Sequence, residues 1–322
     1  MPCDLTRPIF TDDDAAREYL EGLHWPDGPV CRHCGERERV TRLEGEAHRA
    51  GVVQCNACRQ QFTVTVGTVM ERSKIPLHKW VLAMHLLCAS EKGMSGHQLH
   101  RMLGVSYKTA WFMSHRLRAA MTGTAGGGLG GEGKTVEADE TYFGKAENPT
   151  PRNKYLPPPT TKRKRGPAGK RAVVALVERG GKAKTFHVQR ADSETVKQLL
   201  RTTALRASKL MTDESRLYSD VGTEYAHHGK VNHSSGEYVS WDDPTVHTNT
   251  VEGFFSIFKR GMKGVYQHCG EQHLHRYLTE FEFRYNTRTK LGVNDRERAE
   301  LLALGIAGKR LTYRRPDTAA HA

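Results

Sequence analysis

The segment 247–264, which reads HTNTVEGFFSIFKRGMKG, combines an apolar stripe with a line of polar side chains. Four apolar residues recur at the spacing of one helix face: Val251, Phe254, Phe255 and Phe258. This spacing predicts a helix packed on a core. Asn249, Glu252 and Lys259 follow a second stripe of the same helix. A carboxylate with a lysine two turns later suits a site in which the lysine holds a phosphate beside a metal ion. An ordinary amphipathic helix with a solvated polar face has the same pattern.

Two aspartates point to the same chemistry, because each is expected at the end of an apolar strand. Asp139 lies in TVEADETYF and Asp213 in SKLMTDES. Carboxylates at the ends of adjacent strands can converge, and the helix with Glu252 could supply a third oxygen ligand for Mg²⁺ or Mn²⁺. Two such ions about 4 Å apart can activate a water and stabilise the leaving oxygen of a phosphodiester. The alternative is that these acids are surface residues, as we expect for Glu137 and Glu140.

Four cysteines form two CxxC pairs with twenty residues between the pairs: Cys31, Cys34, Cys55 and Cys58. This spacing is typical of a zinc site. Four thiolates in tetrahedral geometry make a closed structural site that leaves no position for catalysis. A redox dithiol is the alternative, but the short β-like runs around the pairs favour a zinc ribbon. We therefore predict a structural Zn²⁺ at these cysteines.

The charge of the chain favours a polyanionic partner. Its 322 residues carry a formal net charge of +13, and the sequence pI is about 9.5. Nucleic acid is favoured over a membrane, because the sequence has no long apolar run and no isolated amphipathic anchor. The N-terminus lacks the basic-then-apolar layout of a signal peptide. We therefore expect a cytoplasmic protein, in which cysteines serve as thiols or metal ligands rather than as disulfides.

Residues 76–121 read as helices, and the last two of these are joined by a short turn at Gly104. Ser106 is the expected N-cap of the final helix. Five of its side chains are expected to lie away from the apolar side: Lys108, Thr109, Phe112, His115 and Arg116. Because a recognition helix offers its N-terminal side chains to base edges, this region is predicted to be a DNA-binding helix-turn-helix. A plain helical hairpin is the alternative.

Composition divides the chain into several regions. Residues 122–134 are rich in glycine and predict a flexible linker. The order of strands and helices after this linker predicts an α/β domain. An insertion at 144–171 is rich in proline and basic residues, so we expect either a loop that follows a phosphate backbone or a solubilising insertion. The expected regions are an N-terminal helix with a zinc ribbon (1–70), the helix-turn-helix-like region (71–121), the linker (122–134), the α/β domain (135–290) and a C-terminal tail (291–322).

Several of these motifs resemble those of insertion-sequence transposases of the DDE class, in the ISXO-like branch that has an N-terminal zinc ribbon. The segments that carry the resemblance are the CxxC pairs, QFTVTVGTVMERSKIPLHKW, VEADETYFG, the TD at 212–213 and HTNTVEGFFSIFKRGMKGVYQH. The resemblance implies an RNase H-like α/β catalytic domain, a divalent metal, and DNA cleavage followed by strand transfer at element ends. It also implies a bacterial, nucleoid-associated protein that acts on DNA as a homodimer or a higher oligomer.

Residue by residue, Asp139 resembles the first catalytic acid of this family and Asp213 the second. The third position is open between Glu252 and Asn249, because some members of the group have an asparagine there. Glu252 with Lys259 fits the spacing of seven found in DDE enzymes, and a charged oxygen suits Mg²⁺ better than a neutral one, so we favour Glu252. Two other functions stay open: a DNA-binding regulator with an inactive transposase-like domain, and a structure-specific RNase H-like nuclease.

Overall fold

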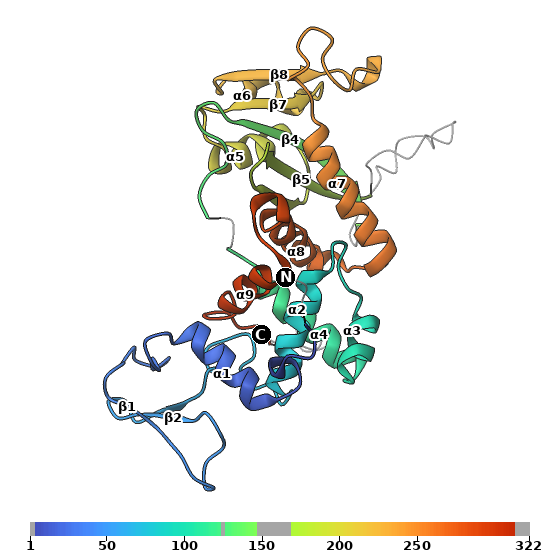
Figure 1. Cartoon of the computed structure of the whole chain (residues 1–322). Coiled ribbons are helices and arrows are strands. Elements are labelled where there is room, and N and C mark those ends of the chain that lie inside the picture. The colour runs from blue at the N-terminus through green and yellow to red at the C-terminus, as the bar shows by residue number, and fades with distance from the viewer. Residues whose placement is uncertain (1–3, 124–125, 147–168, 313–322) are drawn as a thin grey trace, which may run out of the picture. The chain divides into compact units, whose positions relative to one another are not determined.

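The computed structural model describes residues 4–123, 126–146 and 169–312. The chain folds into two compact units, which we call the N-terminal unit (residues 1–124 with 292–322) and the sheet unit (residues 125–291) (Figure 1). Most of the basic, proline-rich insertion expected at 144–171 lies outside the described residues. Within the described ranges, no helix is long and apolar enough to cross a membrane.

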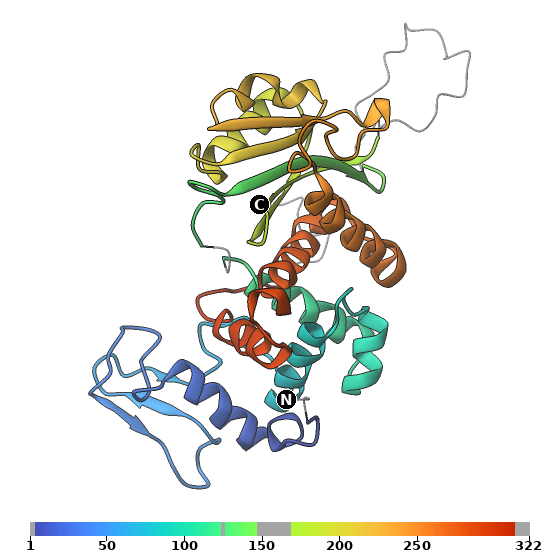
Figure 2. The ribbon, with the colours of Figure 1, turned by 45° about the horizontal axis from the view of Figure 1, so that its top comes forward.

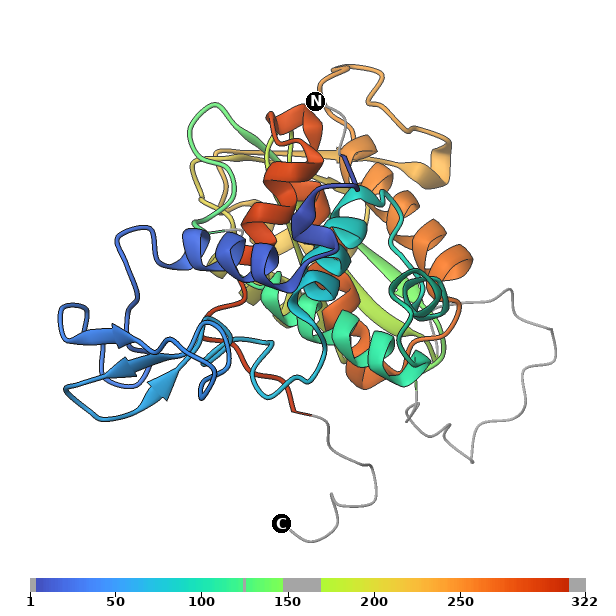
Figure 3. The same cartoon turned by 60° about the horizontal axis from the view of Figure 1, so that its bottom comes forward.

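The first half of the N-terminal unit is a small antiparallel sheet with one helix beside it (Figure 3). Its elements are η1 (Pro8–Phe10), α1 (Asp13–His24), β1 (Val40–Arg42), β2 (Val53–Cys55) and β3 (Gln61–Phe62). Asp12 caps α1, because its carboxylate accepts the backbone N–H of Ala15 at 2.7 Å. Trp25, directly after α1, packs its ring edge-on against Phe62 at a centroid distance of 5.7 Å. This contact joins the helix to the sheet that carries Cys55.

The second half of the N-terminal unit is helical. Its helices are α2 (Leu77–Ala89), α3 (Gly96–Leu103), α4 (Tyr107–Ala120) and α9 (Asp295–Leu304). Ser106 caps α4 by accepting the N–H of Thr109, as predicted. The expectation of a C-terminal tail over 291–322 needs correction, because α9 belongs to this unit. The buried Arg298 of α9 donates to the backbone oxygen of Cys88 in α2 at 2.7 Å, so this segment completes the core rather than trailing from it.

The sheet unit is built on five strands in the order β6-β5-β4-β7-β8. They are β4 (Thr135–Phe143), β5 (Arg171–Glu178), β6 (Ala183–Val188), β7 (Lys209–Asp213) and β8 (His227–Val231). The three strands on one side are antiparallel, and β4, β7 and β8 are parallel. This mixed sheet, with helices on its faces, confirms the prediction of an α/β fold.

Different helices cover the two faces of the sheet (Figure 2). One face packs against α5 (Ser193–Thr203), η2 (Arg216–Tyr218) and α6 (Ser219–Gly222). The other packs against α7 (Asn249–Gly261) and α8 (Leu274–Asn286). The predicted apolar stripe of α7 is buried in this second core: Val251, Phe254, Phe255 and Phe258. Because each such side chain stabilises the fold by roughly 1.5–3 kcal/mol, the stripe anchors α7 on the sheet.

Candidate functional site

Asp139 and Asp213 lie level with each other on neighbouring parallel strands. The ladder between β4 and β7 pairs Glu137 with Met211, and each aspartate lies two residues further along its own strand. Alternate residues of a strand point to the same face. The two aspartates therefore share the sheet face that α7 covers.

Only one of the two aspartates ends its strand, so half of that prediction was wrong. Asp213 is the last residue of β7. Asp139 lies in the middle of β4 and pairs with Ala175 of β5. The strand continues to Phe143 because β5 pairs with β4 along its whole length. The residues before and after Asp139 in β4 are therefore both paired with β5, which fixes the backbone at this position.

Burial and neighbouring carboxylates raise the pKa of both aspartates. Burial raises the pKa of Asp139 to about 7, and the charges of Glu140 and Asp213 add to that effect. Glu252 contributes a smaller increase to the same pKa. Burial also raises the pKa of Asp213, although a backbone N–H and the His233 ring oppose it. Partly buried acids whose charges repel one another form an environment that favours a divalent cation.

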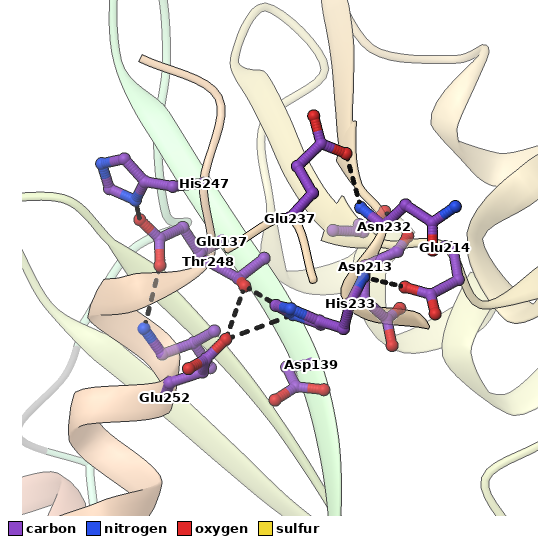
Figure 4. A network of polar contacts seen from close by, with 12 residues as sticks. Glu137, Asp139, Asp213, Glu214, Asn232, His233, Glu237, His247, Thr248 and Glu252 are labelled. Carbon is purple, nitrogen blue, oxygen red and sulfur yellow. Dashed lines mark hydrogen bonds and ion pairs between the residues drawn. The ribbon is translucent and has the colours of Figure 1, made fainter. Parts of the chain in front are cut away.

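The acids are not grouped as closely as the ligands of a fully formed metal site. Among the described residues, the cysteines form the one group of at least three acidic, histidine or cysteine ligands whose atoms all lie within 4.8 Å of one another. Figure 4 shows Asp139, Asp213 and Glu252 extending from β4, β7 and α7 around a common region. Their oxygen donors fit Mg²⁺ or Mn²⁺ in chemistry.

Glu252 is held by two neighbours that sequence reasoning missed. The hydroxyl of Thr248 donates to its Oε1 at 2.9 Å, and Nε2 of His233 lies 3.2 Å from the same oxygen (Figure 4). His233 follows β8 by two residues and also lowers the pKa of Asp213. It therefore lies between the second and third acids. Because β8 reads HHGKV and is not an apolar run, no pattern in the sequence marked this histidine.

The other two predicted site residues of α7 lie apart from this network. Asn249 is the first residue of the helix and its side chain is exposed. Lys259 follows Glu252 by seven residues, which is about 10 Å along a helix. Its Nζ lies 5.9 Å from the centre of the Phe255 ring. The structure thus brings Glu252 toward the aspartates, and leaves Asn249 at the surface and Lys259 two turns away.

Glu137 and Glu140, expected at the surface, are both more enclosed. Glu137 is fully buried on the α7 side of β4. Glu140 faces the opposite side, where the buried hydroxyl of Tyr218 donates to its Oε2 at 2.8 Å. Burial raises the pKa of Glu140. The expectation failed because helices cover both faces of the sheet, so that side chains on either side of β4 are enclosed.

The four cysteines of the zinc ribbon lie together in the N-terminal unit. The sulfurs of Cys31 and Cys58 are 3.7 Å apart. Those of Cys34 and Cys55 are 3.6 Å apart, and all four lie within 4.8 Å of one another. A regular tetrahedron with Zn–S bonds of about 2.3 Å has edges of about 3.8 Å. The cluster therefore fits a structural Zn²⁺.

Both cysteine pairs use the same backbone turn. The residue after each pair has a positive φ, 80° at Gly35 and 61° at Arg59. Each donates its N–H at 2.9 Å to the oxygen of the first cysteine of its pair, Cys31 or Cys55. The repeated turn explains how two separate segments present their sulfurs in matching ways.

Helices α3 and α4 are joined by a short turn, which fits either the predicted helix-turn-helix or a plain helical hairpin. Gly104 ends α3 in a left-handed conformation with φ of 60°. Lys108 is exposed on the first turn of α4. His115, expected on the outer side, is fully buried. That expectation was wrong because α2 and α9 also pack on α4 and widen its buried face.

A groove of about 320 Å³ lies beside the first turns of α4. Its lining includes three basic residues, Arg72, Lys108 and Arg116. The guanidinium of Arg116 stacks on Phe112 at 4.7 Å from the ring centre. Among the residues that the structure describes, no acid lines this groove, so its chemistry suits an anionic partner such as a phosphate backbone.

Two regions of the chain match known protein domains. Residues 128–286 match the ISXO2-like transposase domain, and residues 11–61 match the transposase zinc-ribbon domain. Together they cover well over half of the chain and define the class of the protein as an insertion-sequence transposase. The chain belongs to the ISXO2-like transposases that carry an N-terminal zinc ribbon. The resemblance identified in the sequence is thereby confirmed.

Individual relatives are more distant. The chain is 27% identical over 292 residues to an uncharacterized protein in transposable element ISH50 of Halobacterium salinarum, which covers 88% of this chain and 94% of the relative. The crystal structure of the Mos1 strand transfer complex is 14% identical and covers 69% of this chain and 73% of that one, with a TM-score of 0.28. A Mos1 transposase paired-end complex with the left transposon end is also 14% identical, covers 70% and 74%, and has a TM-score of 0.27. Such low TM-scores add no support to an assignment.

Proposed function

We propose that this chain catalyses metal-dependent DNA cleavage and strand transfer at the ends of its insertion sequence. Asp139, Asp213 and Glu252 are the proposed metal ligands. The observation that supports this most is their origin on three elements around one region, with the pKa of Asp139 raised to about 7 by burial and by neighbouring carboxylates. A site that concentrates negative charge in this way is suited to a divalent cation.

The protein's own groups have distinct parts in this proposal. Asp139 and Asp213 are carried by strands and supply rigid oxygen ligands, and Glu252 supplies the third from α7. The Thr248 hydroxyl and the His233 ring orient the Glu252 carboxylate. Mg²⁺ or Mn²⁺, when bound, would activate a water or a 3′-hydroxyl and stabilise the leaving oxygen. Lys259 would hold a DNA phosphate as a point charge.

DNA is the proposed partner, in the form of the element ends and the target. The net charge of +13 favours a polyanion. The basic groove beside α4 offers cations to a phosphate backbone, and the exposed Lys108 lies where a recognition helix reads base edges. Because two ends must be processed together, the active form is proposed to be a homodimer or higher oligomer at the bacterial nucleoid.

The deciding experiment uses labelled duplexes that carry the DNA flanking the coding region. Incubation with Mg²⁺ or Mn²⁺ should cut one end and join it to a plasmid target. Asp139→Asn and Asp213→Asn should abolish both steps and keep DNA binding. Asp220→Asn, at an exposed acid of α6, is the matched control and should remain active.

The products also separate the two alternatives. Cleavage without joining would support a structure-specific nuclease. Binding of the correct ends with no chemistry in either metal would support a regulator with an inactive domain, and would refute the proposed catalysis.

A further inference from the structure

Glu137 caps helix α7 from a distant part of the chain. Its Oε2 accepts the backbone N–H groups of Thr250 and Val251 at 2.7 and 2.9 Å. These are the second and third residues of α7, whose N–H groups have no partner inside their own helix. The Thr250 hydroxyl also donates to Oε1 of Glu137 at 2.8 Å. The cap therefore comes from β4, 113 positions earlier in the sequence.

Helix α7 lacks a cap of its own. Thr248, the residue before it, makes no side-chain bond to the backbone of the first turn. Its hydroxyl is instead directed to Glu252. A carboxylate at a helix N-terminus also interacts favourably with the helix dipole. Glu137 thus satisfies the first turn and leaves Thr248 available to orient Glu252.

Arg179 holds the Glu137 carboxylate from the turn between β5 and β6. Its Nε donates to Oε1 of Glu137 at 2.5 Å. Its Nη1 and Nη2 donate to the backbone oxygens of Thr245 and His247 at 2.6 and 2.7 Å. Burial and the charge of Arg179 lower the pKa of His247, and Nη2 of Arg179 also donates to Nδ1 of the His247 ring at 3.0 Å. The segment that leads into α7 is thereby tied to both β4 and the β5–β6 turn.

We propose that Glu137 is a positioning residue that sets the place of Glu252 relative to Asp139. Glu137 lies two residues before Asp139 on the same face of β4, and one of its partners, Val251, directly precedes Glu252. The carboxylate therefore links the first and third acids by a short, buried path. This inference rests on the proposed function, because it requires Asp139 and Glu252 to hold the metal.

Two substitutions separate the position of the carboxylate from its charge. Glu137→Asp keeps the charge and withdraws the carboxylate by one methylene group. Glu137→Gln keeps the length and places an amide NH₂ among N–H donors. The same two substitutions at Glu280 provide the matched control, since Glu280 is also fully buried in the sheet unit and is paired with Arg284.

The readouts include two that do not depend on activity. Calorimetric titration of zinc-loaded protein measures Mn²⁺ binding, and hydrogen exchange measures opening of the first turn of α7. Both Glu137 variants should weaken Mn²⁺ binding roughly 10–100-fold, as changes behind metal ligands do. The Mg²⁺ concentration for half-maximal cleavage should rise in parallel, and amides 249–252 should exchange faster. The Glu280 variants should leave Mn²⁺ affinity within about twofold of the wild type.

The outcomes distinguish this inference from the proposed function. A folded Glu137→Asp protein that binds Mn²⁺ like the wild type would overturn the inference, because the position of the carboxylate would then not matter for metal binding. A wild type that neither binds Mn²⁺ nor cleaves DNA would overturn the proposed function, and the inference with it. If both Glu137 variants fail to fold, Thr250→Val removes one bond to the same carboxylate, and unchanged Mn²⁺ affinity there would equally overturn the inference.

Discussion

Replacing Asp139 by asparagine should stabilise the Mg²⁺-free protein while it abolishes the chemistry. The pKa of Asp139 is about 7 in the folded chain against an ordinary 3.8, because burial and nearby carboxylates disfavour its charged form. When folding raises the pKa of a carboxyl group, the group destabilises the fold at any pH above its pKa in the unfolded chain. The destabilisation grows with pH and reaches its full size above its pKa in the folded chain. At pH 8 the difference corresponds to roughly 4 kcal/mol. Asparagine has nearly the same shape and carries no charge, so it should remove most of this destabilisation.

The assay is urea unfolding of zinc-loaded wild-type and Asp139→Asn proteins without Mg²⁺. The free energy of unfolding of the sheet unit should be higher for the variant at pH 8. By pH 5 the advantage should fall below about 2 kcal/mol, because there the wild-type carboxyl is protonated in the folded state. Added Mg²⁺ should stabilise the wild type and leave the variant unchanged. Asp220→Asn, at an exposed acid, should change stability by no more than about 0.5 kcal/mol.

Two results would refute this reasoning. A variant that is no more stable than the wild type at pH 8 would mean that the surroundings of Asp139 do not disfavour its charged form. A stabilisation that is the same at pH 5 and pH 8 would mean that its cause is packing rather than charge. Either result would also weaken the case for a cation at this site.

Three further outcomes are expected. Cys31→Ser should reduce zinc from about one ion per chain to well below one and lower the stability of the N-terminal unit, as measured by metal analysis and thermal unfolding. Glu252→Gln should reduce DNA cleavage about 100-fold or more, and Asn249→Ala less than about 10-fold, in single-turnover assays with Mg²⁺. Lys108→Ala should reduce the slope of log binding constant against log salt by about one, as determined by titrating a labelled end at several salt concentrations.

Each of these outcomes has its own control. Cys88→Ala changes a buried cysteine of the same unit outside the zinc cluster and should keep the zinc. A larger loss for Asn249 than for Glu252 would reverse the assignment of the third ligand. Lys92→Ala, at an exposed lysine of the same unit, should leave the salt dependence unchanged. An unchanged slope for Lys108 would remove α4 from the proposed DNA surface.

The sequence by itself determined the features that depend on local geometry. The spacing of Cys31, Cys34, Cys55 and Cys58 was sufficient to predict their cluster, because each pair is a short turn. The buried stripe of α7 and the Ser106 cap followed from helical periodicity and hydrogen bonding within one turn. The strands that carry Asp139 and Asp213 were recognisable as apolar runs. For the helix stripe, the cap and the turn within each cysteine pair, neighbours in space are also neighbours in the chain.

Tertiary structure alone decided how the acids are held. Nothing near Glu137 in the sequence shows that it would be buried, because its partners are backbone N–H groups of a helix 113 positions later. His233 reaches Glu252 only because the end of β8 lies near the start of α7. The helix α9 was hidden for the same reason, since its Arg298 bonds to a chain segment 210 positions earlier. A polar side chain is buried only where distant groups satisfy its hydrogen bonds, and the pairing of strands and helices determines which groups those are.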